Sequence, residues 1–216
     1  MSVRLQAALA GVVVLASACP SNDCFIGDQS KDPEIGLVYR SSDGVMHELS
    51  AGGQVPLILP PQGGKVMFIG VRAKNIDGCP VTLTASLRDQ CTNNLVALEE
   101  RPVTLEATGD GWLTPKVPTA LENYSNLPAC PRASIDRDIN NEPYELTIKV
   151  EDKTGRKGSV KMMVTPDCMD SAERDQCECE CAAEYRQGQT CNGEHPDSGV
   201  PPGTCPTDGG MIGGDR

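Results

Sequence analysis

Apolar and polar residues alternate one by one along several stretches of the chain, which is typical of β-strands with one face in a core and one in water. The clearest stretches are residues 81–88, 103–107, 144–150 and 160–165, the last with one fault at Met163. Residues 65–73 are apolar on both faces and predict a central strand that is covered on both sides. No long stretch has a helical period, so the pattern predicts an all-β fold.

Turn signals separate these stretches. Residues 37–40 and 45–49 flank Ser41-Ser42-Asp43-Gly44, whose composition predicts a hairpin turn. Several short strands with turns between them indicate a β-sandwich, and residues 34–166 are long enough for one such domain.

The last pair of predicted strands, residues 144–164, is the most specific fold signal. Tyr144 opens one strand, an Asp- and Gly-containing turn follows, and a strand with Ser159 and Val160 closes the pair. This segment resembles the final hairpin of bacterial immunoglobulin-like and cadherin-like domains. The resemblance implies an immunoglobulin-like β-sandwich in which Tyr144 is a tyrosine-corner residue, with its ring buried and its hydroxyl bonded to backbone. Leu146 stands where antibody domains have a Cys, so their inter-sheet disulfide is absent.

The N-terminus has the parts of a secretory signal. Arg4 gives a positive start, residues 5–15 are apolar except for Gln6, and small residues follow. The apolar run is shorter than the roughly 20 residues that a membrane-spanning helix needs. Ala16-Ser17-Ala18-Cys19 resembles the lipobox of bacterial lipoproteins, although that motif prefers Leu where Ala16 stands. An ordinary signal peptide cut after Ala18 is the alternative.

The lipobox resemblance implies that residues 1–18 are a lipoprotein signal peptide and that acylation (palmitate and related chains) of Cys19 anchors the protein to a membrane. Residue 20 is Pro and not the Asp that resembles an inner-membrane retention signal, which favours the outer membrane of the cell envelope. We expect residues 19–33 to be the lipidated Cys and a polar tether.

The charge balance narrows the range of partners. Asp and Glu number 30 against 19 Lys and Arg, giving a net charge of −11. An acidic surface repels nucleic acid, so we expect no nucleic-acid partner.

Cysteines are frequent for an exported chain. With Cys19 acylated, an even number of them remains to form disulfides: Cys24, Cys79, Cys91, Cys130, Cys168, Cys177, Cys179, Cys181, Cys191 and Cys205. We expect the first four to form one group and the last six another, and within the first group we expect Cys79 to pair with Cys130.

The second group defines a small disulfide-rich module at residues 167–191, where few apolar residues separate the cysteines. Its end, Cys179 to Cys191, is similar to the closing half of an EGF-like module. Cys177, Cys179 and Cys181 leave a metal site as an alternative to disulfides. Residues 192–216 are rich in Gly and Pro and predict a flexible tail.

Oxygen-bearing side chains recur at alternate positions in Asp136, Asp138, Asn140 and Glu142. Calcium binds six to eight oxygens, and the first half of an EF-hand loop supplies them with this spacing. A calcium site is therefore a candidate here. A solvated acidic turn leading into Tyr144 is the alternative.

Residues suited to catalysis are few. Of the two His residues, His47 falls in a predicted strand and His195 in the tail, and no hydrolase motif is present. Trp112, the single Trp, is expected to be a core residue, with a ligand platform on a loop as the alternative. We expect a lipid-anchored, non-catalytic module of the envelope that has no cofactor beyond candidate Ca²⁺ and binds or scaffolds an envelope protein or polysaccharide. The alternatives are a calcium-stabilised adhesion-type module and a carboxylate-based hydrolase.

Overall fold

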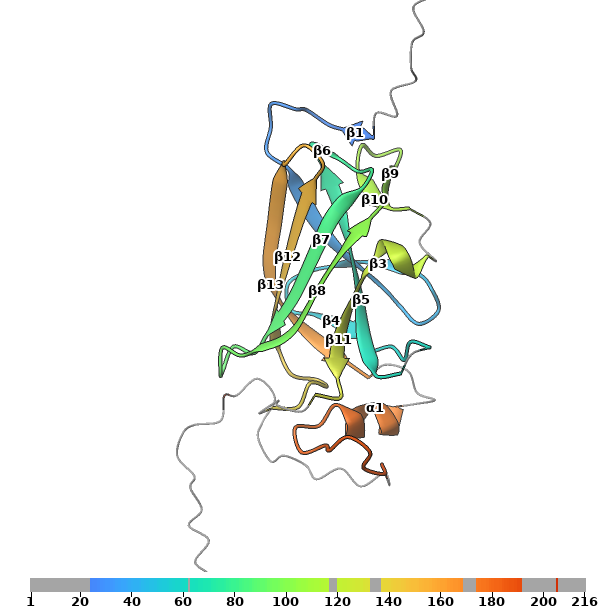
Figure 1. Cartoon of the computed structure of the whole chain (residues 1–216), viewed down its shortest axis with the longest axis vertical. Coiled ribbons are helices and arrows are strands. Elements are labelled where there is room, and N and C mark those ends of the chain that lie inside the picture. The colour runs from blue at the N-terminus through green and yellow to red at the C-terminus, as the bar shows by residue number, and fades with distance from the viewer. Residues whose placement is uncertain are drawn as a thin grey trace, which may run out of the picture.

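In a computed structural model the protein is an all-β sandwich, described for residues 24–61, 63–116, 120–132, 137–168, 174–191 and 205. Two sheets pack face to face, and a short helix lies at one end of them (Figure 1). The predicted fold class is therefore confirmed. Among the described residues no helix is long and apolar enough to span a membrane.

The sandwich has one five-stranded and one six-stranded sheet. The five-stranded sheet has the order β4 (Gly53–Pro56), β13 (Lys157–Asp167), β12 (Tyr144–Asp152), β7 (Val81–Arg88) and β8 (Leu95–Val103). The other sheet has the order β3 (Met46–Leu49), β2 (Glu34–Arg40), β5 (Lys65–Lys74), β10 (Leu113–Pro115) and β9 (Leu105–Ala107), and β11 (Ser125–Cys130) pairs with β5. A separate small sheet joins β1 (Phe25–Ile26) to β6 (Ile76–Asp77), and a 3₁₀ turn, η1, covers Leu121–Asn123.

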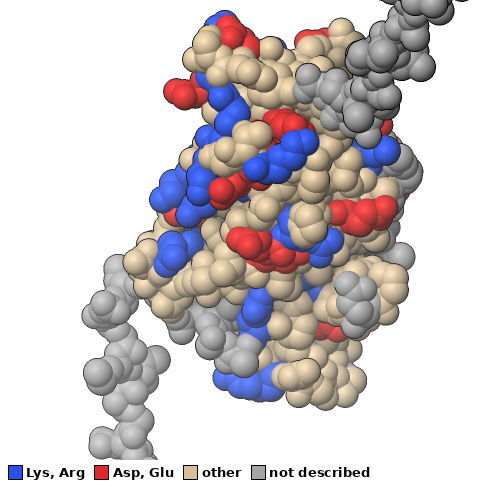
Figure 2. Space-filling model, turned by 45° about the horizontal axis from the view of Figure 1, so that its top comes forward, with Lys and Arg blue, Asp and Glu red and all other residues tan. Residues whose placement is uncertain are grey.

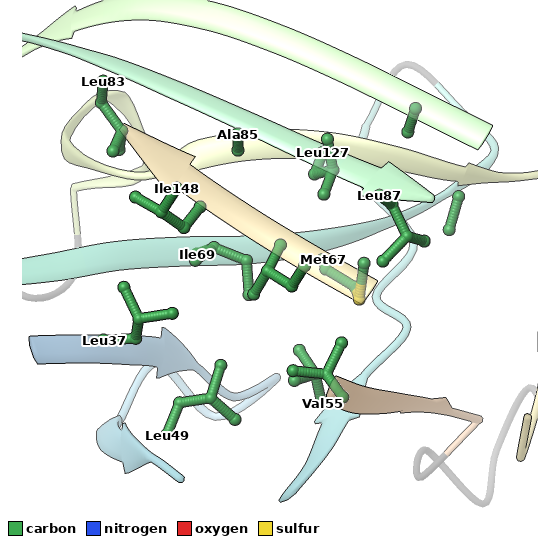
Figure 3. Close-up of a cluster of buried hydrophobic side chains, with 14 of the residues drawn as sticks. Leu37, Leu49, Val55, Met67, Ile69, Leu83, Ala85, Leu87, Leu127 and Ile148 are labelled. Carbon is green, nitrogen blue, oxygen red and sulfur yellow. The ribbon is translucent and has the colours of Figure 1, made fainter. Parts of the chain in front are cut away.

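The alternating pattern places the core of the five-stranded sheet as predicted. Leu83, Ala85 and Leu87 of β7 are buried, while the Thr and Ser residues between them face outward. Leu146 and Ile148 of β12 lie beside them in antiparallel register. Figure 3 shows the β7 side chains and Ile148 on the same cluster as Met67 and Ile69 of β5, from the other sheet.

Strand β5 is covered on both faces, which confirms the prediction for residues 65–73. Its outer face buries Val66 and Phe68 in a second cluster with Val38 of β2 and Tyr124. Gly70 lies under the Tyr124 ring, where an added Cβ would lie 2.9 Å from Tyr124 Cδ1. This close approach requires glycine.

One predicted strand divides between the two sheets. Residues 103–107 alternate, but β8 ends at Val103, opposite Val81 of β7, and β9 begins at Leu105, opposite Pro115 of β10. The chain thus passes from one sheet to the other at Thr104. Alternation reports which face is buried and not which partner strand is bonded, so the pattern alone predicts one strand here.

The end of the domain has the expected immunoglobulin-like features. β12 and β13 form the predicted hairpin, and β13 also pairs in parallel with the early strand β4. The Tyr144 ring is buried, and its hydroxyl donates to the backbone carbonyl of Asp138 at 2.9 Å. Burial raises the pKa of this phenol well above its ordinary value. The predicted tyrosine corner is thereby confirmed.

Asp152 organises the turn of this hairpin. Its carboxylate accepts the backbone N–H groups of Thr154 (2.8 Å), Arg156 (3.0 Å) and, from β6, Asp77 (3.1 Å). Burial acts to raise the pKa of Asp152, but the Thr154 hydroxyl, which donates to Asp152 at 2.6 Å, and these backbone groups outweigh it and hold the pKa below its ordinary value. The carboxylate therefore joins the hairpin to the small β1–β6 sheet.

The N-terminal segment differs from the free tether expected over residues 19–33. Cys24 is bonded to Cys79, and Phe25 pairs with Asp77 in the small sheet. Farther on, Arg156 donates to the carbonyls of Gln29 (2.9 Å) and Lys31. From Cys24 onward the segment is fixed to one end of the sandwich, because these contacts replace the solvent exposure that its polar composition suggested.

Helix α1 (Arg174–Glu180) and the turns after it lie at the opposite end of the sandwich (Figure 1). Cys177 and Cys181 are buried within the main core cluster. Disulfides and the sandwich, and not a separate core, hold this short module in place.

Candidate functional site

The acidic segment before β12 surrounds a buried arginine. Arg137 donates to Asp89 at 2.9 Å and to Glu142 at 2.6 Å, and its guanidinium lies 5.4 Å from the centre of the Tyr144 ring. Burial acts to lower the pKa of Arg137, but the hydrogen bond to Glu142 and the nearby carboxylates raise it above its ordinary value. The guanidinium is therefore a permanent cation inside this network.

The other candidate calcium ligands bond to backbone groups. Asp138 accepts the N–H of Ala183 at 2.8 Å, and Asn140 accepts the N–H of Cys168 at 2.9 Å. Asp136 lies outside the described residues. Where the chain is described, Asp138 and Glu142 join no cluster of three His, Cys, Asp or Glu side chains close enough to share an ion. This segment is a structural network that does not favour calcium, because an arginine and two backbone amides use the oxygens that the ion would need.

The ten described cysteines form five disulfides, but the predicted grouping is wrong. The pairs are Cys24–Cys79, Cys91–Cys205, Cys130–Cys181, Cys168–Cys177 and Cys179–Cys191. The expected Cys79–Cys130 bond is absent, since Cys79 lies beside β1 and Cys130 ends β11 next to the helix. Two disulfides instead join the sandwich to the C-terminal region, which explains how a module with so few apolar residues keeps its place.

Three sulfur atoms come close together in the core. Those of Cys168, Cys177 and Cys181 all lie within 4.8 Å of one another. This is not the set that the sequence spacing suggested, because Cys179 turns away to bond Cys191. All of these cysteines are disulfide-bonded, and a disulfide sulfur lacks the thiolate that binds zinc.

Trp112 is not a core residue, contrary to the prediction. It is half-buried on the turn between β9 and β10, and its ring lies 4.9 Å from the Arg72 guanidinium and 4.3 Å from Lys74 Nζ. Arg72 and Lys74 are two residues apart on β5 and project from the same outer face of the sheet. The ring packs on these cations because Leu113, the next residue, takes the inward position opposite Ala73.

Carboxylates fix the cations under the ring. Arg72 is bonded to Glu48 of β3 and, at 2.7 Å, to Asp110 in the Trp112 turn. The Thr108 hydroxyl donates to Asp110 and holds the pKa of that carboxyl below its ordinary value. We call Trp112, Arg72, Lys74, Glu48 and Asp110 the Trp112 surface. It is a fixed, half-exposed aromatic residue among charges of both signs, which is a composition suited to binding.

His47 lies on the exposed strand β3. Its Nε2 lies 3.1 Å from the Ser41 hydroxyl, and its ring stacks on Tyr39 at 5.1 Å between ring centres. The Ser41 hydroxyl donates to Asp43, so the carboxylate bonds the hydroxyl and not the imidazole. A serine-type triad has the opposite order, with the carboxylate orienting the histidine. His195 and Cys19 lie outside the described residues.

Comparison with known proteins assigns no family. No family model matches the sequence, and no curated protein matches it. Among solved structures, CopC from Methylosinus trichosporium OB3b aligns over 56% of this chain and 89% of that chain, with 18% identity and a TM-score of 0.27. A TM-score of 0.27 is too low to support a shared fold or a shared ligand.

Proposed function

We propose that the protein is a lipid-anchored, non-catalytic binding or scaffolding module of the bacterial cell envelope, held to the outer membrane by acylated Cys19. Its partner is an envelope protein or polysaccharide. The observation that carries the binding role is the Trp112 surface, where the ring of the single Trp, on the β9–β10 turn, packs on two cations of strand β5.

The attachment of Cys24 to the sandwich supports a fixed orientation of the protein relative to the membrane. Five residues lead from Cys19 to Cys24, and that length of chain spans at most about 18 Å when fully extended. The Cys24–Cys79 disulfide attaches this short link to the end of the sandwich that carries β1 (Figure 1). Helix α1 is at the opposite end and would face away from the membrane.

Acylation of Cys19 is the first expected result. Expressed in a bacterial host, the full chain should take up labelled palmitate and partition into detergent, and Cys19→Ala should lose both properties. Ser17→Ala keeps a small residue near the cleavage site and should behave as the parent. Labelling that persists in Cys19→Ala would show that the anchor is elsewhere or absent.

Removal of the Trp112 ring is the second expected result. With a partner isolated from envelope extracts on the immobilised protein, Trp112→Ala should weaken the measured affinity about 30-fold, as loss of an aromatic hot spot does. Leu98→Ala is the matched control, because Leu98 is 57% exposed and lies on β8 of the other sheet. Equal binding by both variants would remove the Trp112 surface from the proposal. If the protein hydrolyses a substrate, and replacing a single Asp or Glu abolishes this activity, the proposal of a non-catalytic module is wrong.

A further inference from the structure

Two arginines from distant parts of the chain line one small pocket at the α1 end. Arg132 follows β11, and Arg186 follows α1 in the disulfide-rich module. With Pro131, Tyr185 and Gln187 they enclose about 160 Å³. We call this the Arg132–Arg186 pocket.

Backbone carbonyls hold both guanidinium groups. Arg132 donates from Nη2 to the carbonyl of Pro128 at 2.8 Å. Arg186 donates from Nη1 to the carbonyls of Glu184 at 3.1 Å and Tyr185 at 3.2 Å. Each guanidinium is therefore positioned by the main chain and keeps N–H donors for another acceptor.

Among the described residues, neither arginine of the pocket has a carboxylate partner, whereas four other arginines do. Arg72, Arg101, Arg137 and Arg174 each form ion pairs. Basic and acidic side chains lie next to one another over the face drawn in Figure 2. Asp and Glu number 30 against 19 Lys and Arg, yet none of the described residues that line this pocket is acidic.

The position of Arg132 makes this lack of a counter-charge costly. Burial lowers the pKa of Arg132, and no charge within the described part of the chain offsets this effect. An anion in the pocket would supply the missing charge and bond two guanidinium groups at once. Charge-assisted hydrogen bonds of this kind are the strong ones, and arginine's planar fork matches oxyanions.

We propose that the Arg132–Arg186 pocket binds an oxyanion group, a carboxylate, sulfate or phosphate, of the ligand that the module recognises. The inference rests on the proposed binding function and names the chemistry of a second site. The ring of Tyr185 and Pro131 form an apolar wall for the group that carries the anion. Because the pocket lies at the α1 end, the oxyanion would come from a ligand on the side away from the anchoring membrane.

The test is a titration of the full, disulfide-bonded chain with inorganic phosphate, sulfate and acetate at constant ionic strength, with chloride as reference. The readout is the ¹H–¹⁵N signals of the arginine side chains. The Arg132 and Arg186 Nε–H signals should shift and saturate at millimolar anion, while the Trp112 indole signal stays fixed as an internal reference. Shifts that rise linearly without saturation, or equally at all arginines, would overturn the proposal.

Three variants separate a built site from general charge effects. Arg132→Gln and Arg186→Gln should each raise the phosphate Kd at least about tenfold. Arg174→Gln, with the same charge change in the same module, should stay within about twofold. Arg132→Lys keeps the charge but loses the fork, and should recover only part of the affinity. If Arg186→Gln loosens its loop, seen as a lower unfolding midpoint, Arg132→Gln decides alone.

Vesicles identify the source of the anion. The chain lacking the signal and Cys19, mixed with vesicles of phosphatidylglycerol or phosphatidylcholine, should bind neither through the pocket. Arg132-dependent binding to phosphatidylglycerol vesicles would contradict a ligand on the far side of the membrane. Failure of the anion titration with successful Trp112-dependent partner binding would remove this inference alone, and the reverse result would remove the Trp112 surface alone.

Discussion

Replacing Arg137 by methionine is expected to lower the free energy of unfolding by about 3–5 kcal/mol, because it leaves one buried and one largely buried carboxylate without their counter-charge. The exposed fractions of the side chains are 6% for Arg137, 5% for Asp89 and 12% for Glu142. Methionine fills much of the arginine volume, so lost charge and hydrogen bonds dominate the change. Urea unfolding of the oxidised protein at neutral pH measures it.

Arg72→Met is the matched control. Arg72 also bonds two carboxylates, but Glu48 and Asp110 are 73% and 53% exposed. Water solvates those carboxylates when the arginine is removed, so the loss should stay near or below about 1 kcal/mol. Equal losses in both variants would show that burial does not govern the Arg137 network.

Two further measurements distinguish the arginine network from a calcium site. The triple variant Arg137→Met, Asp89→Leu, Glu142→Met removes all three charges of the network. It should recover most of the stability that Arg137→Met loses. Calcium should leave the unfolding midpoint of the parent unchanged. If the unfolding midpoint rises with calcium and falls with a chelator, Asp138, Asn140 and Glu142 form a calcium site after all.

The sequence is informative wherever a residue's neighbours along the chain decide its environment. Alternation places Leu83 and Ile148 in the core because a strand's period of two is local. The tyrosine-corner role of Tyr144 could be predicted because the strand and turn that follow it resemble those of immunoglobulin-like domains. The partner of its hydroxyl is also local, a carbonyl six residues earlier in the chain.

Long-range pairing is where sequence reasoning fails. Cys130 could have bonded any other cysteine, and only the fold brings it to Cys181. Arg137 stands between two aspartates in the sequence, but its partner Asp89 lies 48 residues away along the chain. Trp112 was expected in the core because it is large and apolar, yet Leu113 pairs with Ala73 and is buried, while the Trp112 ring packs outside on Arg72 and Lys74.

Loss of the Cys130–Cys181 disulfide, which no sequence pattern predicted, should also lower the free energy of unfolding strongly. Replacing Cys130 and Cys181 together by serine opens a loop whose ends are 51 residues apart, which corresponds to about 4 kcal/mol in the chain-entropy model. Both cysteines belong to the core cluster, and buried serine hydroxyls add a further cost. The Cys91–Cys205 disulfide remains, but α1 should lose its fixed position on the sandwich, because two of the contacts left near it are single hydrogen bonds, from Ile139 N–H to the Cys181 carbonyl (2.8 Å) and from Ala183 N–H to Asp138.

Hydrogen exchange in the oxidised double variant is the measurement. Amides of α1 and of Ile139 should lose protection, while β7 and β12 keep theirs at the level of global unfolding. The control replaces Cys179 and Cys191, whose ends are only 12 residues apart and whose bond stays within the module. That pair should cost about 3 kcal/mol at most by loop length and leave Ile139 protected. If α1 remains protected without the Cys130–Cys181 bond, apolar packing alone holds the module, and its small core contributes more than its composition suggests.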